Sequence, residues 1–325
     1  MLRQGSKRVR MGVLLLGVAL VAACAEGAEP DTAPQARANE ELIVQAANYE
    51  LLAGEESRFI AGLLTPDQMF VSFGEVDIEF FYLGTEEGEG TAEEGPTATG
   101  TFLAIEGSND SATDSHPEAT TATEGRGVYA ADVTFDRAGF WAAQVTADLS
   151  DGSLSGRAAF EVSEDNRYPA VGEKAPRTDN LTAETDDAPR EAIDSRARDG
   201  EPVPDPELHQ ITIAESIRRG EPALVVFATP VYCVSRFCGP ITDMAVELEK
   251  EYGDRVNVIH VEIWRNFQNT VVNKGAAEWV YRDEDLTEPW IYLVDDKGKI
   301  AARWDNVATR QEIEPLLKKL PPLSS

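Results

Sequence analysis

Apolar and polar residues alternate along several short segments in the first half of the chain. Every second residue is apolar there, which is typical of a strand with one face in a hydrophobic core. The segments with this pattern are residues 76–80, 129–135 and 141–145, and an Asp-Gly turn signal introduces a further strand over 154–162. No helical period separates them. The first half of the chain is therefore predicted to be all-β.

Strands at this spacing predict an immunoglobulin-like β-sandwich over residues 46–163. Its middle, about residues 84–126, is acidic and rich in Gly, Ser and Thr, and is expected to be a mostly disordered insertion. His116 lies in that insertion, and the region contains no catalytic constellation. We therefore expect a binding or spacer role for this domain.

Strand and helix patterns alternate in the second half of the chain. A continuous apolar run such as ALVVFA at 223–228 is expected of a strand buried on both faces. The predicted elements are a strand at 223–228, a helix at 241–252, a strand at 256–263, a helix at 270–281, strands at 290–294 and 299–304, and a last helix opened by a Thr309–Glu312 capping box. This α/β domain is predicted over residues 211–325, after a linker and entry segment at 164–210.

The first residues have the pattern of a lipoprotein signal peptide. Four basic side chains precede an apolar run at 11–20 that is too short to span a bilayer. Val21-Ala22-Ala23-Cys24 follows and resembles a lipobox. We expect residues 1–23 to be removed, Cys24 to be lipidated and 24–45 to be a tether. The chain is then an extracytoplasmic cell-envelope protein, anchored to a membrane by lipid and not spanning it.

The net charge and the number of cysteines restrict the possible functions further. Removing residues 1–23 moves the formal net charge from −29 to about −33, since four basic groups and no acids leave with it. Such a surface argues against nucleic-acid binding, which depends on basic patches. The chain has three cysteines, and lipid would occupy Cys24. Cys233 and Cys238 are left with each other in a compartment where disulfides persist.

The order of elements in the second half, with a cysteine pair between its first strand and helix, resembles the thioredoxin fold. Extracytoplasmic TlpA-like thiol–disulfide oxidoreductases are the most similar members. The resemblance covers about residues 170–322 and rests on VGEKAP at 171–176, FATPVYC at 227–233 and EPWIYL at 288–293.

This resemblance implies a redox site. Cys233 would be the nucleophile and Cys238 the resolving thiol, because a cysteine before a helix is stabilised as thiolate. Pro289 would be the cis-proline of a substrate groove, with Trp290 and Tyr232 as substrate-binding neighbours. The implied partners are thiols or disulfides of secreted or envelope proteins and an unidentified reducing partner.

The spacing of the pair departs from the family's C-x2-C. Residues five apart on a helix are rotated by about 140° and lie about 7.5 Å apart along the axis, so their Cα atoms are near 9 Å apart. That exceeds disulfide reach. Either Cys233 lies off the helix or the first turn unwinds, and we expect the second, as a redox-linked change.

Two other functions stay open. A C-x4-C-G pattern, completed by Gly239, resembles one peroxiredoxin subgroup, although Pro230 stands where those peroxidases have Thr. Alternatively the pair is a structural disulfide in a redox-inert binding module. Weak redox activity is suggested by the lack of a buried acid near Phe227 and by Glu288, whose charge would disfavour a thiolate.

Histidines complete the candidate chemistry. His260 is expected within a strand as a core residue, and His209 lies in the entry segment. Neither forms a Cys/His cluster with zinc spacing. The sequence analysis therefore predicts no metal and no cofactor.

Overall fold

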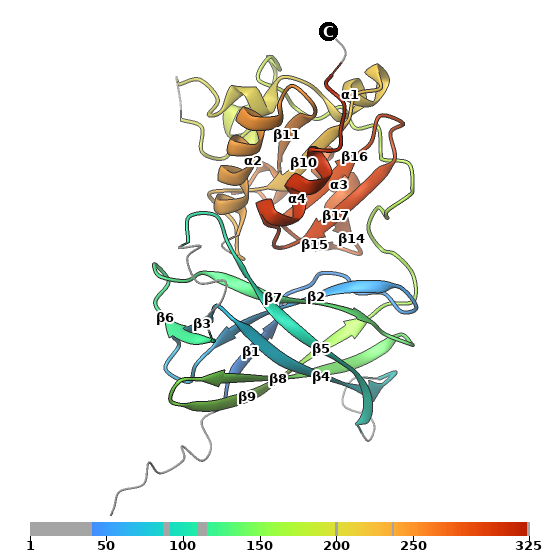
Figure 1. Ribbon diagram of the computed structural model, residues 1–325. Helices are drawn as coiled ribbons and strands as arrows, with labels where there is room; N and C mark the ends of the chain where they lie inside the picture. Colours follow the sequence, from blue (N-terminus) through green and yellow to red (C-terminus); the bar gives the residue numbers. More distant parts are fainter. Residues whose placement is uncertain (1–40, 87–91, 109–115, 199–200, 236, 324–325) are drawn as a thin grey trace, which may run out of the picture. The chain divides into compact units, whose positions relative to one another are not determined.

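The chain contains two main sheets, a nine-stranded one before residue 163 and a four-stranded one after residue 222 (Figure 1). The computed structural model describes residues 41–86, 92–108, 116–198, 201–235 and 237–323. These all belong to one compact unit, Asn39–Ser325. Among the described residues, no helix combines the length and apolar character needed to cross a membrane.

All pairings in the first sheet are antiparallel, in the order β6-β3-β2-β7-β5-β4-β8-β9 with β1 beside β2. The alternation predicted over residues 76–80 is confirmed, because the three apolar residues there are buried and the two acids exposed. The strands are β1 (Ile43–Ala46), β2 (Glu56–Leu64), β3 (Phe70–Ser72), β4 (Glu75–Gly84), β5 (Glu93–Ala104), β6 (Glu118–Thr120), β7 (Gly127–Thr134), β8 (Gly139–Leu149) and β9 (Gly152–Val162).

This sheet curls until its edges meet. The chain just before β1 reaches β9, where the Leu42 amide donates to the Ser155 carbonyl at 3.0 Å. Gly156 permits that approach, because a Cβ there would lie 1.8 Å from the Leu42 carbonyl oxygen. The enclosed core is rich in aromatic rings packed edge to face or tilted, at centroid distances of 5.0–6.1 Å. They belong to Phe59, Phe80, Phe135, Trp141 and Phe160.

The second sheet has the order β11-β10-β16-β17, in which only the β10–β11 pair is parallel. Two further sheets, β12-β13 and β14-β15, have two strands each. The elements are η1 (Arg190–Ala192), η2 (Pro206–His209), α1 (Ile213–Arg219), β10 (Ala223–Ala228), α2 (Cys238–Tyr252), β11 (Asn257–Glu262), β12 (Trp264–Asn266), β13 (Val271–Val272), α3 (Lys274–Val280), β14 (Tyr281–Arg282), β15 (Asp285–Leu286), β16 (Trp290–Val294), β17 (Ile300–Asp305) and α4 (Arg310–Leu317).

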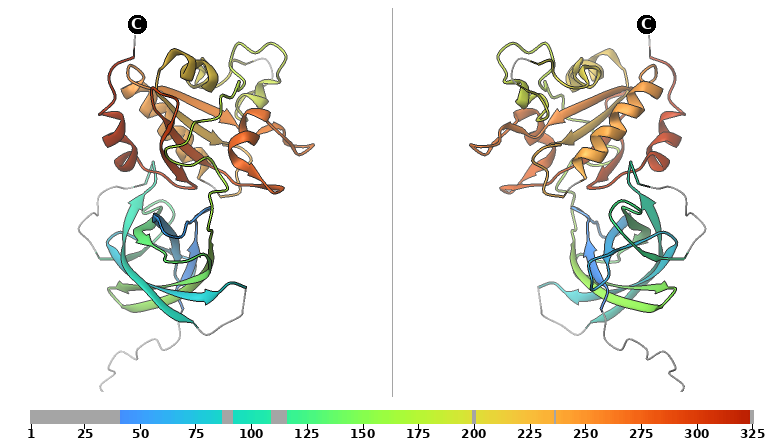
Figure 2. Two further views of the ribbon diagram at one scale, coloured as in Figure 1. Left: turned by 90° about the vertical axis from the view of Figure 1, so that its right-hand side faces the viewer. Right: turned by 90° about the vertical axis from the view of Figure 1, so that its left-hand side faces the viewer.

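Strand β10 is buried at all six positions, as its apolar run predicted. Leu224, Val226 and Ala228 pack with α2 and α4 on one face of the sheet. Val225 and Phe227 pack with α1 and α3 on the other face. Figure 2 shows helices on either side of this sheet. The capping box before α4 is also confirmed.

The predicted fold class, an immunoglobulin-like sandwich followed by an α/β thioredoxin-like domain, is wrong. Strand accounts for 41% and helix for 16% of the described residues, and only four α-helices occur among them. The first half is one antiparallel sheet, not two. Alternation reports only that one face of a strand is buried, and it does so equally for a sandwich and for a single curled sheet. In the second half, the helix predicted at 270–281 shortens to α3 between two-stranded sheets.

Described parts of the expected insertion and of the expected linker and entry segment form strands or lie buried. The acidic stretch at 84–126 contains β6 and the twelve-residue β5, which pairs with both β4 and β7. Its polar composition is explained by its position, since several of its residues are exposed. The segment at 164–210 was expected to be a linker, yet Tyr168, Ile193 and Asp194 are buried.

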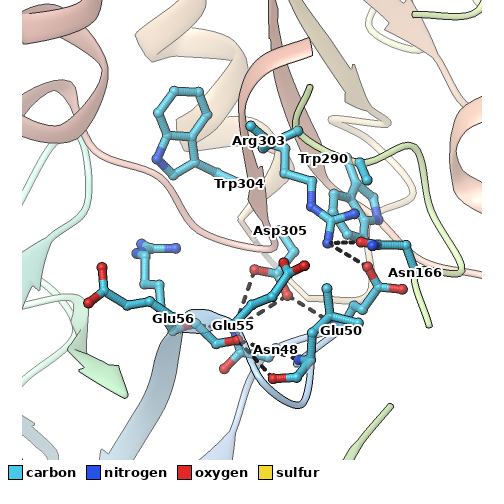
Figure 3. A pocket seen from close by; sticks show the side chains of 14 residues that line it. Asn48, Glu50, Glu55, Glu56, Asn166, Trp290, Arg303, Trp304 and Asp305 are labelled. Carbon is cyan, nitrogen blue, oxygen red and sulfur yellow. Dashed lines mark hydrogen bonds and ion pairs between the residues drawn. The ribbon is translucent and has the colours of Figure 1, made fainter. Parts of the chain in front are cut away.

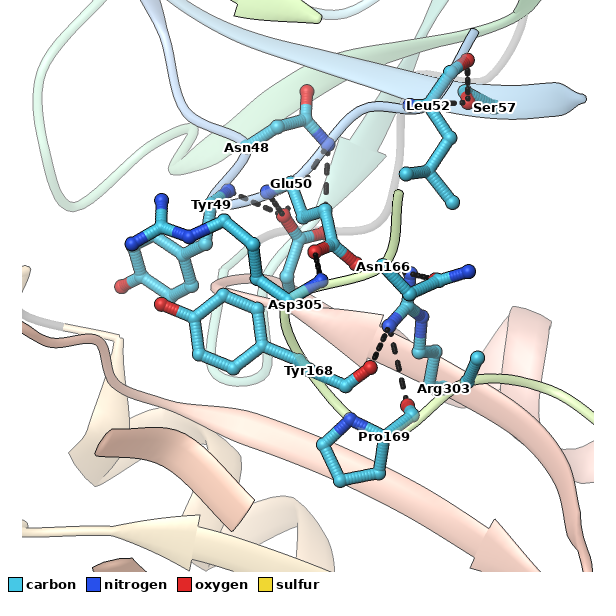
Figure 4. Close-up of polar contacts among 12 residues, drawn as sticks. Asn48, Tyr49, Glu50, Leu52, Ser57, Asn166, Tyr168, Pro169, Arg303 and Asp305 are labelled. Carbon is cyan, nitrogen blue, oxygen red and sulfur yellow. Dashed lines mark hydrogen bonds and ion pairs between the residues drawn. The ribbon is translucent and has the colours of Figure 1, made fainter. Parts of the chain in front are cut away.

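A buried carboxylate connects the segment after β1 to the end of β17. Asp305 accepts the backbone N–H of Tyr49 at 2.5 Å and that of Glu50 at 3.4 Å (Figure 4). The Asn48 side-chain amide donates to the same carboxylate at 3.4 Å. Backbone N–H groups in a buried position need such an acceptor. Asp305 therefore determines where residues 48–50 cross the second sheet.

Charged pairs surround that carboxylate. Arg303 contacts Glu50 at 2.5 Å and donates to the Asn166 side chain at 3.0 Å, on the wall of a polar cavity of about 400 Å³ (Figure 3). Arg58 of β2 lies 2.7 Å from Glu312 of α4. These contacts are partly or fully buried, so solvent screens them less than surface pairs.

Replacing Asp305 by Ala should destabilise the protein by about 2–4 kcal/mol, because two partly buried N–H groups and the Asn48 amide lose their acceptor. Urea unfolding followed by circular dichroism measures this. The matched control is Asp148→Ala, at an exposed position of β8, which should change stability by no more than about 0.5 kcal/mol. Equal stability of the two variants would contradict the role assigned to Asp305.

Candidate functional site

Cys233 and Cys238 form a disulfide between β10 and α2, with their Cα atoms 6.0 Å apart. A bond across the C-x4-C spacing is thus confirmed. Cys238 is the first residue of α2, whereas Cys233 lies before the helix. Cys233 lies off the helix in this oxidised form of the pair, and the redox-linked change in the first helical turn stays a prediction.

The two cysteines differ in exposure. Cys238 is fully buried at the start of α2 and packs in the core that this helix forms with the sheet. Cys233 is half-buried. The Cys238 backbone N–H points at the Cys233 sulfur at 3.3 Å, and the Ser235 hydroxyl lies at the same distance from it. An amide at a helix N-terminus and a hydroxyl both stabilise a thiolate at Cys233 after reduction.

A buried carboxyl group lies beside the pair. An oxygen of Glu288 and the two sulfurs all lie within 4.8 Å of one another. Burial raises the pKa of Glu288 to about 8, and the charge of Glu262 adds to the effect. At neutral pH Glu288 is therefore mostly protonated. The expected repulsion of a thiolate is corrected accordingly, since it arises only above about pH 8.

Glu262 is a second buried acid, which the sequence analysis missed. Its side chain is 1% exposed, and burial raises its pKa. It accepts the Ser195 backbone N–H at 2.8 Å. The sequence has no acid near Phe227 in β10. In the structure a buried acid lies on the neighbouring strand β11, where Glu262 pairs with Ala228. Only the strand pairing could have revealed this.

The Glu288–Pro289 peptide bond is cis. The Tyr49 hydroxyl donates to the Glu288 carbonyl and lies 3.0 Å from the Asn306 side-chain oxygen. Tyr49 comes from the segment after β1, more than 180 residues before the cysteines. No local signal marked it as part of this site. The role of Pro289 in a substrate groove stays a prediction.

The two aromatic residues predicted to bind substrate occupy different positions. Tyr232 is half-buried and stacks on Phe267 at 4.0 Å between ring centroids, so its role stays a prediction. Trp290 is 1% exposed and packs between Tyr49, Tyr168 and Tyr292. Trp290 also lines the cavity of about 400 Å³, and its predicted role in substrate binding stays a prediction.

Cys24 and the predicted signal peptide and tether up to residue 40 lie outside the described residues, so lipidation and location stay predictions. His116 is exposed. Metal donors are available at the cysteine pair, because Cys233, Cys238 and Glu288 converge there. With the disulfide formed, however, the two sulfurs are bonded to each other and offer no thiolate.

In comparisons with known proteins, no family model and no curated protein match this chain. The resemblance to thioredoxin-like proteins therefore stays a prediction from the sequence.

The pKa of Glu288 makes stability depend on pH. Its folded value of about 8 lies above the ordinary value of 4.5, so the folded protein keeps a proton that the unfolded chain loses. Stability should fall as pH rises between these values, by up to about 1.4 kcal/mol per pH unit. Glu288→Gln cannot titrate and should show a shallower fall in urea unfolding between pH 5 and 8. The exposed control Glu284→Gln should follow the wild type, and an unchanged slope in Glu288→Gln would refute the assignment.

Proposed function

We propose that this protein exchanges thiols and disulfides with secreted or envelope proteins through Cys233 and Cys238, while a lipid on Cys24 holds it at a membrane. The observation that carries the proposal is the asymmetry of the pair. One cysteine is within reach of a partner, the other is buried at the start of a helix, and a carboxyl group that holds a proton at neutral pH lies beside both.

The exchange consists of two successive displacements at sulfur. A thiolate of the partner attacks the Cys233 sulfur, and the Cys233–Cys238 bond breaks. Its electron pair goes to the Cys238 sulfur, which takes the proton held by Glu288. A second partner thiolate then attacks the partner's own sulfur in the mixed disulfide and releases Cys233 as thiolate. Two electrons pass from the partner dithiol to the pair, and the reverse sequence reduces a partner disulfide.

The surface next to the cysteines supports a polypeptide partner. A cavity of about 890 Å³ adjoins the cysteine loop and is lined there by Val234, Ser235, Phe237 and Pro240. Val234 is 90% exposed and adds an aliphatic side chain to the surface beside Cys233. Apolar surface of this kind accommodates the side chains around a partner cysteine.

The order of reaction predicts which variant traps a partner. With Cys24 replaced by Ser throughout, reduced Cys238→Ser should form a stable mixed disulfide with glutathione disulfide at Cys233. Reduced Cys233→Ser should react at least about tenfold more slowly, because burial hinders attack by Cys238. Mass spectrometry of the adducts over time measures both rates.

The reduction potential of the wild-type pair separates exchange from a structural bond. Equilibration with glutathione buffers should give a value between about −270 and −120 mV, the range of exchange catalysts. A value below about −300 mV, or equal reactivity of the two single variants, would contradict the proposal. A reduction potential below about −300 mV would identify a structural disulfide.

A further inference from the structure

Three buried side chains converge behind the cysteine pair without forming a complete hydrogen-bond network. Asp194 follows η1, His209 ends η2 and His260 lies within β11, and all three side chains are 0% exposed. One carboxylate oxygen, Asp194 Oδ2, lies 3.5 Å from His209 Nε2 and 3.5 Å from His260 Nδ1. Charge-assisted hydrogen bonds are shorter, about 2.7–2.9 Å.

The proton on His260 can be located from its second ring nitrogen. Nε2 lies 3.1 Å from the Ala228 carbonyl oxygen, which can only accept, so Nε2 carries the hydrogen. In a neutral imidazole, Nδ1 then carries a lone pair and no hydrogen. That lone pair faces Asp194, which also only accepts, so the contact needs a positive charge, which either a second proton on His260 or a bound cation supplies. Among the described residues, neither ring nitrogen of His209 has a hydrogen-bond partner.

Asp194 itself is held in place from the other side. Arg196 donates to both carboxylate oxygens, at 3.0 and 2.6 Å, and also contacts Asp205 at 2.8 Å. A carbonyl bonded to the far nitrogen of a histidine and a donor that orients a carboxylate are the usual outer contacts of a metal site.

We propose that Asp194, His209 and His260 bind one divalent transition-metal ion of the zinc type. Two imidazoles and one carboxylate are a common zinc ligand set. Metal–ligand bonds of about 2.0–2.2 Å in a tetrahedron place donor atoms roughly 3.3–3.6 Å apart, which fits the two separations of 3.5 Å. All three donor atoms lie within 4.8 Å of one another. The proposal revises the expectation of no metal, and it is independent of the redox function.

The ion would hold the segment 194–196 against β11. Ser195 lies between Asp194 and Arg196 in the chain. Its backbone N–H donates to Glu262, and its hydroxyl accepts the Val231 backbone N–H at 3.2 Å. Val231 lies two residues before Cys233. Metal binding therefore orders the support of the cysteine loop, and the ion has a structural role.

The test uses the full chain with its disulfide intact and a purification tag that contains no histidine. After treatment with a chelator, the protein should bind one equivalent of Zn²⁺, measured by elemental analysis and calorimetry. Co²⁺ should give weak visible bands without a sulfur charge-transfer band, because no ligand is a thiolate. His209→Gln and His260→Gln should each lose at least about tenfold in affinity, and Zn²⁺ should raise the Tm of the wild type more than that of either variant.

Two controls remove the competing sites. His116→Gln removes the chain's third histidine, and the triple variant Cys24→Ser/Cys233→Ser/Cys238→Ser removes every sulfur donor of a cysteine; both should bind Zn²⁺ as the wild type does. If the histidine variants do not fold, ¹⁵N spectra of the three imidazoles of the wild type, recorded with and without Zn²⁺, test the proposal. One equivalent of Zn²⁺ should shift two of them and leave His116 unchanged. No stoichiometric binding, unchanged spectra or full binding by His209→Gln would overturn the proposal.

Discussion

The carboxylate of Asp305 is the interaction on which the arrangement around the cysteine pair depends. It is buried at the end of β17 and accepts backbone N–H groups of Tyr49 and Glu50. Because these half-buried groups are bonded to one fixed carboxylate, residues 48–50 are held in one position. Tyr49 thereby reaches the Glu288 carbonyl, next to the cysteines. A residue of the first half of the chain thus becomes part of a site in the second half.

Behind the disulfide, ionisable groups follow one another inside the protein. Glu288 lies beside the sulfurs, the charge of Glu262 acts on Glu288, and Ser195 joins Glu262 to the segment that holds Asp194. Each group is costly to bury unless it is neutral or has a partner. The raised pKa of Glu288 and the positive charge needed between His260 and Asp194 are two consequences of the same constraint. They give the region its proton-holding and metal-binding chemistry.

The first sheet shows how far patterns along the chain can mislead. Strand β4 is evident from Val76, Ile78 and Phe80, whereas β5 was taken for disorder because Gly, Thr and Glu dominate it. Its pairing with β4 and β7 supplies the stabilisation that its composition does not. The contact of Leu42 with β9 closes the sheet and depends on a glycine at 156, which looked like an ordinary strand residue.

By itself the sequence determined the local features of this protein. They are the apolar strand at 223–228, the capping box at Thr309 and a cysteine pair placed before a helix, because periodicity, capping and spacing act between residues close in the chain. The tertiary structure alone decided that one sheet curls on itself, that Glu262 is the buried acid, and that Tyr49, Asp194 and His209 reach the second sheet. These contacts join residues tens to hundreds of positions apart, and only packing and the satisfaction of buried polar groups select them.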